Sequence, residues 1–470
     1  MSNKRIEKIR QKLDDIILKA QKRNIRFAIP DIVDRMKIRE TIQDFIKDKK
    51  RIIYGGTAID FWLKKKNLAI YDEELPGDIE FYSPYPLDDM YKICNKLKKM
   101  GFKNVVGRQA LHHDTFTIFV EYVEFCDMTY MNPSMMKNNI PHHVEDGLTY
   151  VKPDFLINDM YRVFANPLHD YPFRLKKVFE RFVLLKENYF TPPEKPTRCP
   201  VNSKQNNKLI EMKDQIFDKF ILNNEDVILC GSKAYNYYLE YSNKKSKTYQ
   251  PPENDPLVLV INGQDFKQCF EEIIRVIGEK DIKVKEYTKF FQFYDRKLVI
   301  EYEGKECVVL LGNNGICTQY HKMQPDNSDN FFQLCSYDYL MIYLNSLVFK
   351  NYSEDKLKRQ YECMIHYLDL MREYYLDKKN LIGVEEDNIF SHFILECKWS
   401  SLSEIYKSRE RIKKRVIKGI KPIIYEYRPD AKMETKPPDI IYTNSSGNQI
   451  INTKNLIIRN KNFLPNNIKK

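Results

Sequence analysis

The chain of 470 residues repeats one pattern at two places, and this repeat limits its fold more than any other feature. At residues 51–63 ("RIIYGGTAIDFWL") an apolar run ends in Gly55-Gly56 and continues with apolar residues at helical spacing. Residues 226–239 ("DVILCGSKAYNYYL") do the same around Gly231-Ser232. Each stretch predicts a strand that turns directly into a helix. The chain has only 15 glycines, so two in a row at Gly55-Gly56 require an explanation.

Further matches follow the two turns in the same order along the chain. They are Glu121-Tyr122 with Glu301-Tyr302, Cys126 with Cys307, and "LKKVFER" from Leu175 with "LKRQYEC" from Leu357. The offset between matched residues grows slowly, from 176 (55 to 231) to 182 (175 to 357). We interpret this as an internal duplication of one mixed α and β unit. Chance similarity between two segments rich in Lys, Tyr and Ile is the alternative.

A segment rich in proline and polar residues, 191–207 ("TPPEKPTRCPVNSKQNN"), separates the two halves and predicts a linker. The expected organisation is a first domain with an N-terminal helix at 1–190, a linker at 191–208, a second domain at 209–385 and a basic C-terminal region at 386–470. With 43% hydrophobic and 13% aromatic residues, the chain can fill substantial cores.

The formal net charge of +12 favours a polyanionic partner such as nucleic acid. Ten cysteines without a C-x-x-C pair argue against a zinc ribbon or a disulfide scaffold and for a reducing compartment. The chain shows no signal peptide and no apolar run near 18 residues, which predicts a soluble, intracellular protein without a membrane partner.

The first glycine turn predicts a phosphate site. A strand that ends in two glycines brings bare amides to a helix N-terminus, where free N–H groups and the helix dipole favour an anion. A tight turn that binds nothing is the alternative reading of Gly55-Gly56 taken alone.

Carboxylates follow this turn at a spacing that suits a metal. In "LPGDIEFYSP" Asp78 and Glu80 flank Ile79, so alternation along a strand places both acids on one face. Two neighbouring carboxylates favour a divalent cation between them. The β-rich run "TFTIFVEYVEFCDMTYM" offers Glu121, Glu124 and Asp127 as a third acid, and we favour Asp127 because it lies among apolar residues. A solvated strand edge, or a buried and merely hydrogen-bonded Asp127, is the alternative.

The pattern "GG…DIE…D" resembles that of the polymerase-β-like nucleotidyltransferase superfamily. More narrowly, "YGGTAIDFW", "GDIEFYSP" and "DFLINDMYRVFANP" resemble the catalytic subunit of poly(A) polymerases of poxviruses, asfarviruses and giant viruses. Two features depart from the superfamily pattern: the interval from Gly56 to Asp78 is longer than usual, and Gly56 stands where many members have a serine.

The resemblance implies an α+β fold of tandem duplicated nucleotidyltransferase units, each a mixed sheet with flanking helices, plus helical N- and C-terminal segments. It implies a template-independent enzyme that uses two Mg²⁺ or Mn²⁺ ions to add AMP from ATP to RNA 3′ ends. The same resemblance assigns Gly55, Gly56 and Thr57 to the triphosphate and Asp78, Glu80 and Asp127 to the metals and catalysis. It further implies a homodimer that works in the host cytoplasm at the viral factory, with the virion as a second location.

Other functions remain open at this point. A uridylyl-, CCA-adding or oligoadenylate-forming transferase would keep the same site, because no motif here reads the base. An RNA-binding or dimerising pseudoenzyme is the alternative from another class, and the intact acids argue against it.

The second half lacks the acids. The strand that matches Ile79–Tyr82 is "LVLV" at 257–260, and Val308 is expected at the position of Asp127. Glu253 and Asp255 precede this strand and would be competent only in another register. We therefore expect a degenerate, catalytically silent copy.

Two basic segments complete the sequence. Residues 406–422 ("YKSRERIKKRVIKGIKP") carry eight Lys and Arg, of which Lys413, Lys414, Arg415 and Lys418 are candidates for RNA phosphate contacts. The alternative is a helix that packs on the protein through a narrow apolar stripe and exposes its charged face to solvent. The N-terminal residues 4–27 predict a basic amphipathic helix whose apolar face packs on the first domain.

Overall fold

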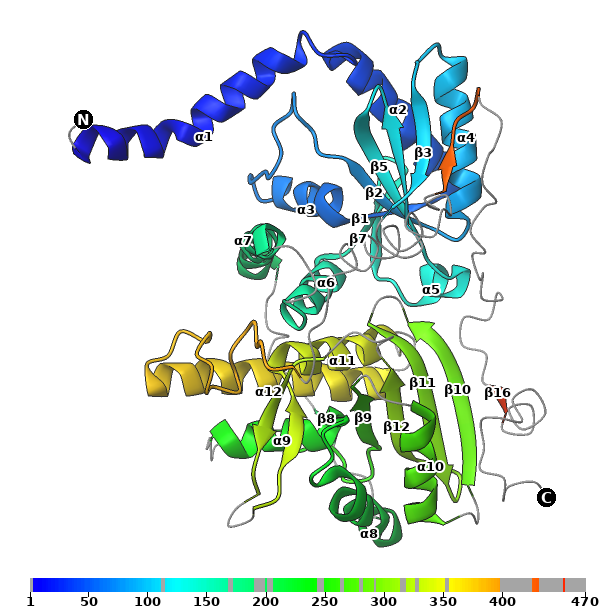
Figure 1. Cartoon of the computed structure of the whole chain (residues 1–470), viewed down its shortest axis with the longest axis vertical. Coiled ribbons are helices and arrows are strands. Elements are labelled where there is room, and N and C mark those ends of the chain that lie inside the picture. The colour runs from blue at the N-terminus through cyan, green and yellow to red at the C-terminus, as the bar shows by residue number, and fades with distance from the viewer. Residues whose placement is uncertain are drawn as a thin grey trace, which may run out of the picture. The chain divides into compact units, whose positions relative to one another are not determined.

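The computed structural model describes residues 3–110, 115–167, 172–189, 199–200, 206–242, 249–262, 266–278, 282–290, 293–312, 318–325, 329–350, 355–397, 425–430 and 451–452. The chain forms two compact units (Figure 1). The first comprises Met1–Met136, Pro141–Leu156 and Ser408–Tyr442, and the second comprises Lys137–Ile140, Ile157–Lys407 and Thr443–Lys470. This division differs from the boundaries expected from the sequence, since residues 157–190 fall in the second unit.

The first unit is built on a mixed sheet of eight strands in the order β15-β3-β4-β5-β2-β1-β7-β6. The strands are β1 (Ile52–Tyr54), β2 (Ile79–Ser83), β3 (Val105–Gln109), β4 (Thr115–Val120), β5 (Val123–Tyr130), β6 (His142–Glu145), β7 (Leu148–Val151) and β15 (Glu426–Tyr427). The pairs β2–β5 and β1–β7 are parallel, and the other neighbours are antiparallel.

The first unit also contains helices. They are α1 (Asn3–Ile25), α2 (Ile32–Lys49), α3 (Gly55–Lys64), α4 (Pro86–Lys99) and the short α5 (Pro133–Asn138), the end of which belongs to the second unit. Helix α2 begins where the Asp31 side chain accepts a hydrogen bond from the Asp34 amide at 2.9 Å. It packs on α4 through an apolar stripe that includes the fully buried Ile38 and Ile42.

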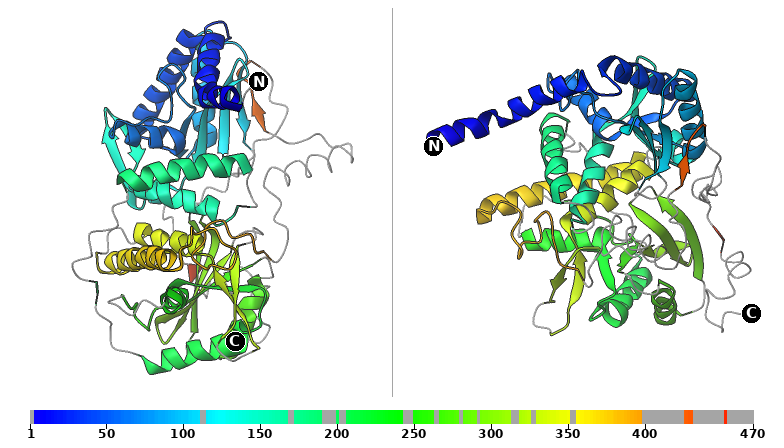
Figure 2. Two further views of the ribbon diagram at one scale, coloured as in Figure 1. Left: turned by 90° about the vertical axis from the view of Figure 1, so that its left-hand side faces the viewer. Right: turned by 45° about the horizontal axis from the view of Figure 1, so that its top comes forward.

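Helix α1 does not bury the apolar face predicted from its pattern. Its Ile9 and Ile16 are about half exposed, at 49% and 53%, and among the described side chains of the helix only Ile25, at its end, is buried. Helix α1 extends away from the sheet of its unit (Figures 1 and 2). The expectation that this face packs on the first domain is therefore wrong, because an amphipathic pattern predicts a helix but not its partner.

The edge strand of this sheet comes from the far end of the chain. Strand β15 pairs antiparallel with β3 and is the orange arrow beside it in Figure 1. Tyr425, the residue before it, is fully buried and hydrogen-bonds to Tyr91 of α4. The main-chain amide of Gln109 donates to the Tyr425 carbonyl at 2.9 Å. The edge of β3 is thus covered along most of its length.

The second unit repeats the architecture, with strands in the order β13-β14-β8-β9-β12-β11-β10-β16. They are β8 (Val227–Cys230), β9 (Leu257–Ile261), β10 (Ile282–Phe290), β11 (Tyr294–Tyr302), β12 (Lys305–Gly312), β13 (Tyr320–Met323), β14 (Phe332–Cys335) and β16 (Ile451–Asn452). Strands β10, β11, β12, β9, β8, β14 and β13 correspond in order and direction to β3, β4, β5, β2, β1, β7 and β6. The internal duplication and the α+β class are confirmed.

Details of one hairpin are duplicated too, and they correct the matches proposed from the sequence. Ile118 pairs with Cys126 as Ile300 pairs with Val308, and a β-bulge follows each pair. Cys126 therefore corresponds to Val308, and not to Cys307. In the turn that joins the strands, Glu121-Tyr122 corresponds to Glu303-Gly304, since all four residues have positive φ. The match to Glu301-Tyr302 is thus two residues out of register.

Helices of the second unit are α6 (Pro153–Phe164), which begins in the first unit, α7 (Pro172–Tyr189), α8 (Asn207–Ile216), the π-helix η1 (Phe217–Ile221), α9 (Gly231–Ser242), α10 (Phe266–Ile277), α11 (Tyr337–Lys350) and α12 (Asp355–Lys379). Aromatic packing explains why α6 and α7 belong to the second unit. Tyr161 lies 5.1 Å from Phe182 and 6.3 Å from Tyr337 between ring centroids. Lys186 also pairs with Asp369 of α12 at 2.9 Å.

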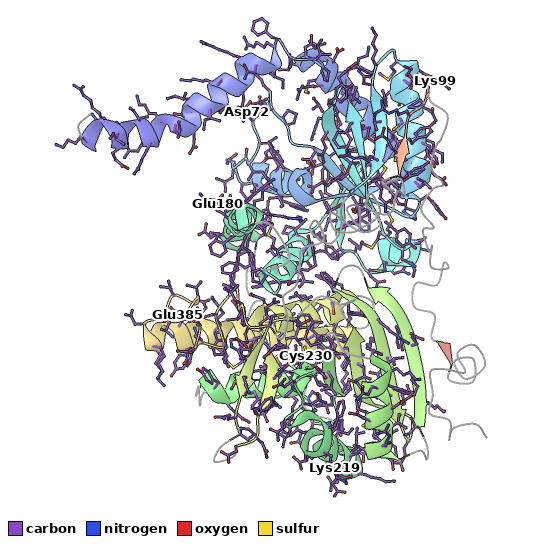
Figure 3. All side chains as sticks on the ribbon, viewed as in Figure 1. Asp72, Lys99, Glu180, Lys219, Cys230 and Glu385 are labelled. Atoms are coloured by element: carbon purple, nitrogen blue, oxygen red, sulfur yellow. A yellow bond between two sulfur atoms is a disulfide. The ribbon has the colours of Figure 1, made fainter. Side chains whose placement is uncertain are left out.

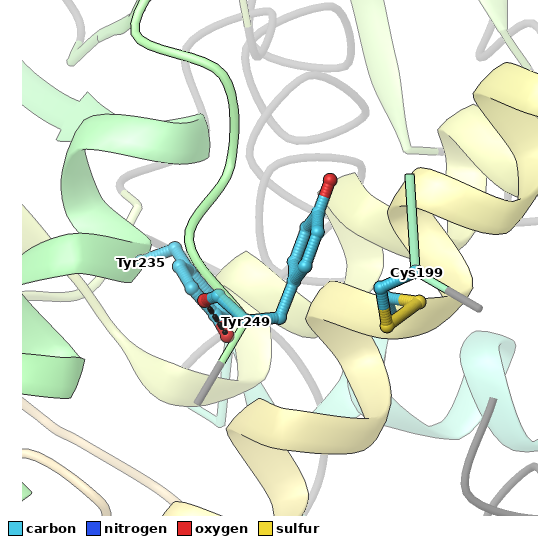
Figure 4. Close-up of a disulfide and its surroundings, with 4 residues drawn as sticks. Cys199, Tyr235 and Tyr249 are labelled. Carbon is cyan, nitrogen blue, oxygen red and sulfur yellow. Dashed lines mark hydrogen bonds between the residues drawn. A yellow bond between two sulfur atoms is a disulfide. The ribbon is translucent and has the colours of Figure 1, made fainter. Parts of the chain in front are cut away.

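Cys199 and Cys363 form a disulfide that joins the segment before α8 to α12 (Figure 4). The scattered cysteines gave no reason to expect this pair. Cys230, by contrast, is a free thiol buried at the end of β8 inside the unit (Figure 3). Among the described helices, none combines the length and the apolar character needed to span a membrane.

Candidate active site

The turn from β1 into α3 requires glycine at its first position. Gly55 has φ +60°, and a Cβ there would lie 2.0 Å from Oε2 of Glu80. A side chain would therefore be strained by the backbone and would also collide with a carboxylate. Helix α3 begins at this residue without a side-chain cap, so its first amides are available to an acceptor from elsewhere.

That acceptor is Glu80. Its carboxylate receives a hydrogen bond from the Gly56 amide, because Glu80 lies opposite Tyr54 in the β1–β2 ladder. A carboxylate oxygen thus stands where a phosphate oxygen would lie if this turn binds a triphosphate. The Thr57 hydroxyl donates to the main-chain oxygen of Asp78 at 2.7 Å and ties α3 to the segment that carries the acids.

A cluster of three carboxylates lies in the same unit. Asp78, Glu124 and Asp127 can each place an oxygen within 4.8 Å of the other two. Strands β2 and β5 run parallel with Glu80 opposite Asp127, and Asp78 directly precedes β2. The structure therefore brings two of the acids chosen from the sequence, Asp78 and Asp127, together with Glu124.

A β-bulge explains the presence of Glu124. It lies three residues before Asp127, so regular alternation would place the two side chains on opposite faces. The ladder between β4 and β5 steps from Ile118–Cys126 to Phe119–Glu124 and leaves Phe125 as an extra residue. This extra residue restores the phase and brings Glu124 to the face of Asp127. Alternation alone could not reveal it.

The electrostatics of the cluster suit a hard cation. Desolvation raises the pKa of Glu124 to about 7, and the negative charges of Asp127 and Asp78 add to this effect. Arg108 opposes it only in part. Three crowded carboxylates form an all-oxygen donor set of the kind that Mg²⁺ and Mn²⁺ prefer. The residues present therefore fit a divalent metal.

The second unit has no such set at the corresponding positions. Pro256 stands for Asp78, Val258 for Glu80 and Val309 for Asp127. The match of Asp127 to Val308 is wrong by one residue, because Val258 pairs with Val309 as Glu80 pairs with Asp127.

Asp255 lies two residues before β9, and its carboxylate is used in hydrogen bonds within the second unit. Its carboxylate accepts hydrogen bonds from Ser232 at 2.5 Å and from Gln360 at 2.8 Å. Burial raises its pKa despite these bonds. Lys213 donates to the main-chain oxygens of Asp255 and Glu253, so this segment is held in place by contacts within the unit. The candidate RNA contacts Lys413, Lys414, Arg415 and Lys418 lie outside the described residues.

A mixed sheet with a glycine turn at a helix N-terminus, and acids from two adjacent parallel strands beside it, defines a nucleotidyltransferase-like protein. Residues 40–170 match the family model "Poly(A) polymerase catalytic subunit". Residues 198–460 match the model "APMV, Putative poly(A) polymerase, catalytic subunit, C-terminal". The chain belongs to the family of poly(A) polymerase catalytic subunits and is a polynucleotide adenylyltransferase.

Known proteins resemble both halves of the chain. A "Putative poly(A) polymerase catalytic subunit" of Acanthamoeba polyphaga mimivirus is 28% identical over an alignment of 491 positions, covering 96% of this chain and 83% of the relative. One of African swine fever virus (strain Badajoz 1971 Vero-adapted) is 32% identical over 170 residues, or 35% of each chain. The crystal structure of the Megavirus polyadenylate synthase superposes with a TM-score of 0.80 and 29% identity over 93% of this chain and 88% of that one.

Proposed function

We propose that this chain adds AMP from ATP to the 3′ end of RNA without a template, by two-metal nucleotidyl transfer. The observation that carries the proposal is the cluster of Asp78, Glu124 and Asp127 in the same unit as the amides of the Gly55-Gly56 turn. The first provides a metal site and the second an anion site, which are the two requirements for transfer of a nucleotide from a triphosphate.

In this proposal Asp78 and Asp127 are the principal metal ligands, with Glu124 and Glu80 as the further acids. Bound Mg²⁺ or Mn²⁺ ions supply neutralisation of the phosphate charges and a lower pKa for the attacking hydroxyl. The chain orients these acids through fixed neighbours: Thr117 of β4 donates a hydrogen bond to Asp127, and Thr57 holds the main chain of Asp78.

Glu80 has a double role in this proposal. Its carboxylate occupies the Gly56 amide, so a triphosphate binds there only after the Glu80 side chain has moved away. Since Glu80 lies opposite Asp127 in the parallel pair of β2 and β5, a rotation about its side-chain bonds brings it toward the acid cluster. Glu80 then becomes a metal ligand, as the resemblance implies, when ATP takes the amides of Gly55 and Gly56.

The cellular context is proposed from the relatives. Their viral sources support work in the host cytoplasm, at the viral factory, with the virion as a further location. RNA and ATP are the proposed substrates. A homodimer is proposed on the family resemblance alone.

The test is extension of a labelled oligo-RNA without template, with Mg²⁺ or Mn²⁺ and each nucleoside triphosphate singly. We expect long products with ATP and none with UTP, CTP or GTP. Extension with UTP would favour a uridylyltransferase, and addition of a short C-C-A end a CCA-adding enzyme. Products formed from ATP without RNA would indicate an oligoadenylate synthase. Absence of extension under all conditions would make the chain a pseudoenzyme.

A further inference from the structure

Helix α1 carries an apolar stripe with the spacing of a coiled coil. Five apolar residues follow one another at alternating intervals of three and four positions: Ile6, Ile9, Leu13, Ile16 and Ala20. In a heptad written abcdefg they occupy positions a and d. A stripe confined to these positions is narrower than the apolar face of a helix that packs on a globular core, and it is typical of a helix that pairs with another helix.

This stripe is exposed in the structure. Its Ile and Leu side chains are exposed by between 39% and 53%, and Ala20 is exposed as well. Lys22, near the end of α1, pairs with Asp72 at 2.7 Å, and the helix extends away from the sheet of its unit (Figure 2). A row of exposed apolar side chains along one side of a helix marks a surface for a partner.

Cations border the stripe on both sides. The g positions, on one side, hold Arg5, Lys12 and Lys19, and the first e position, on the other side, holds Arg10. All four side chains are exposed. Arg10 lies 3.9 Å from Glu7 in a solvent-exposed pair, which contributes little and is easily exchanged for another carboxylate. Residues at e and g determine which partner a coiled coil accepts.

The acids of α1 lie away from the stripe. Glu7, Asp14 and Asp15 occupy positions b and c, which point outward in a helix pair. The helix therefore presents positive charge beside its apolar seam and keeps its negative charges elsewhere. This arrangement complements a partner that has negative charges beside its own apolar residues.

A second copy of α1 does not complement this surface. In an antiparallel pair, g residues face g residues, so Arg5, Lys12 and Lys19 would meet like charges. In a parallel pair, Arg5 at g would face Arg10 at the following e position. Like charges at these positions disfavour self-pairing. A lipid surface is also disfavoured, because helices that lie on membranes have a broad apolar face.

We propose that α1 binds an acidic amphipathic helix of another protein as a two-stranded coiled coil. The apolar residues of the partner cover the stripe, and its Glu or Asp side chains pair with the cations at g and e. The seam from Ile6 to Ala20 is roughly 22 Å long at 1.5 Å per residue. The pairing is therefore short and reversible, and it weakens as salt screens the flanking charges.

The probes for the test are two synthetic peptides of three heptads, each with Ile at a and Leu at d. One carries Glu at every e and g position, and the other carries Lys there. Fluorescence anisotropy of the labelled peptides measures binding to the full-length protein. We expect the Glu peptide to bind about tenfold or more tightly than the Lys peptide, with a preference that shrinks as salt is raised.

Two matched variants locate the binding surface. Leu13→Gln removes an apolar residue from the seam and is expected to lose about tenfold or more in affinity for the Glu peptide. Leu18→Gln makes the same change at an f position, outside the seam, and is expected to keep the affinity of the wild type. Equal losses in both variants, or no binding of the Glu peptide by the wild type, would overturn the proposal.

A charge exchange tests the choice of partner. Replacement of Arg5, Lys12 and Lys19 by Glu is expected to invert the preference, so that the Lys peptide binds more tightly than the Glu peptide. This outcome is a gain of binding, so it cannot result from misfolding. An unchanged preference would overturn the proposal.

Two further measurements distinguish other occupants of the stripe. Vesicles of phosphatidylserine and phosphatidylcholine are expected to retain the wild type and Leu13→Gln equally, and a loss confined to Leu13→Gln would assign the stripe to a lipid surface. Light scattering is expected to give one mass for both proteins. A dimer of the wild type that Leu13→Gln dissociates would assign the stripe to a second copy. Either result would overturn the proposal.

Discussion

Asp78 and Asp127 are the two acids on which the sequence pattern and the spatial cluster agree. We predict that Asp78→Asn and Asp127→Asn each lower kcat by several powers of ten, because each removes a ligand from a site that stabilises transition-state charge by several kcal/mol. Single-turnover extension at saturating ATP measures the effect, with the melting temperature as the control for folding.

Glu121→Gln is the matched control for these two variants. Glu121 lies in the turn between β4 and β5, where its carboxylate bonds to Asn104 and not to the cluster. It should leave extension unchanged. If Asp78→Asn or Asp127→Asn folds normally and keeps more than about a tenth of wild-type extension, that residue is not a ligand.

The sequence predicted part of this site, and the missing part has a physical cause. Strand alternation predicts Asp78 and Glu80 on one face of the sheet, and an apolar setting favours Asp127 as the third acid. The structure brings Asp78 and Asp127 into one cluster, whereas Glu80 accepts from the Gly56 amide. Glu124 was one of three candidates for the third acid and was not favoured; it joins the cluster because a bulge shifts the phase of β5, and bulges leave no clear pattern in a single sequence. The contact of Glu80 with Gly56 also depends on the ladder between β1 and β2, which no spacing along the chain reveals.

Lys297 of β11 allows a pH prediction in the second unit. Burial, with the nearby Lys350, lowers its pKa from 10.5 to about 7. Between these values the unfolded chain binds more protons than the folded one, so the free energy of unfolding rises with pH. We expect the wild type to gain stability relative to Lys297→Met from pH 7 to 9, by at most about 1.4 kcal/mol per pH unit. Thermal melts of both proteins measure this, and a constant difference would contradict it.

At the scale of elements, the β1–α3 turn should be sensitive to a single methyl group. Gly55→Ala combines a strained positive φ with a collision against Glu80, whereas Gly101→Ala has positive φ but no atom within 4 Å of the new Cβ. Each change costs roughly 1–2 kcal/mol of backbone strain. Only Gly55→Ala should also reduce extension, by about tenfold or more, since it displaces a residue of the proposed site. Equal activities of the two variants would contradict this role of the turn.

The acids before β9 should matter for stability and not for catalysis. Asp255→Ala leaves Ser232 and Gln360 without their shared acceptor, a loss of about 1–3 kcal/mol for buried groups. We expect a lower melting temperature with extension at 25 °C within about threefold of the wild type, or roughly 0.7 kcal/mol in the barrier. Glu253→Ala, at an exposed position, should change neither. Mn²⁺ bound at these residues in a crystal would overturn this expectation.

Elements and their order were more predictable than their contacts. The repeated glycine turn and the drift of the matched residues correctly indicated two copies of one unit. Individual residue matches between the two halves were wrong by one or two positions. The strand pairing is needed to see the shared bulge, at Phe125 and Cys307, and the turn at Glu303-Gly304. The exposed stripe of α1 shows the same limit for helices.

For the molecule as a whole, the charge of +12 leads to a prediction about the segment 406–422. If Lys413, Lys414, Arg415 and Lys418 contact RNA phosphates, each contributes about 0.7 units to the log–log salt slope of binding. Charge reversal of all four should weaken RNA binding alike for every sequence and flatten this slope, with ATP affinity unchanged. Binding titrations between 50 and 200 mM salt, the usual range for such slopes, provide the measurement.

The outcomes of this experiment separate the two interpretations of the segment. An unchanged slope with unchanged affinity would make these charges a solvated surface. A loss of melting temperature in place of a loss of binding would instead indicate that the segment docks on the protein.

The position of β15 in the sequence determines how long the edge of β3 stays uncovered during synthesis. Its partner β3 ends at Gln109, and β15 begins at Glu426, so a ribosome must add more than 300 residues before the edge of β3 can be covered. At the usual rate of roughly 5–20 residues per second this takes about 15–60 s. During that interval each nascent chain carries a bare edge strand, and neighbouring chains on one messenger carry the same edge at the same time. Mispairing of the β3 edge during synthesis is thus most frequent before β15 emerges from the ribosome.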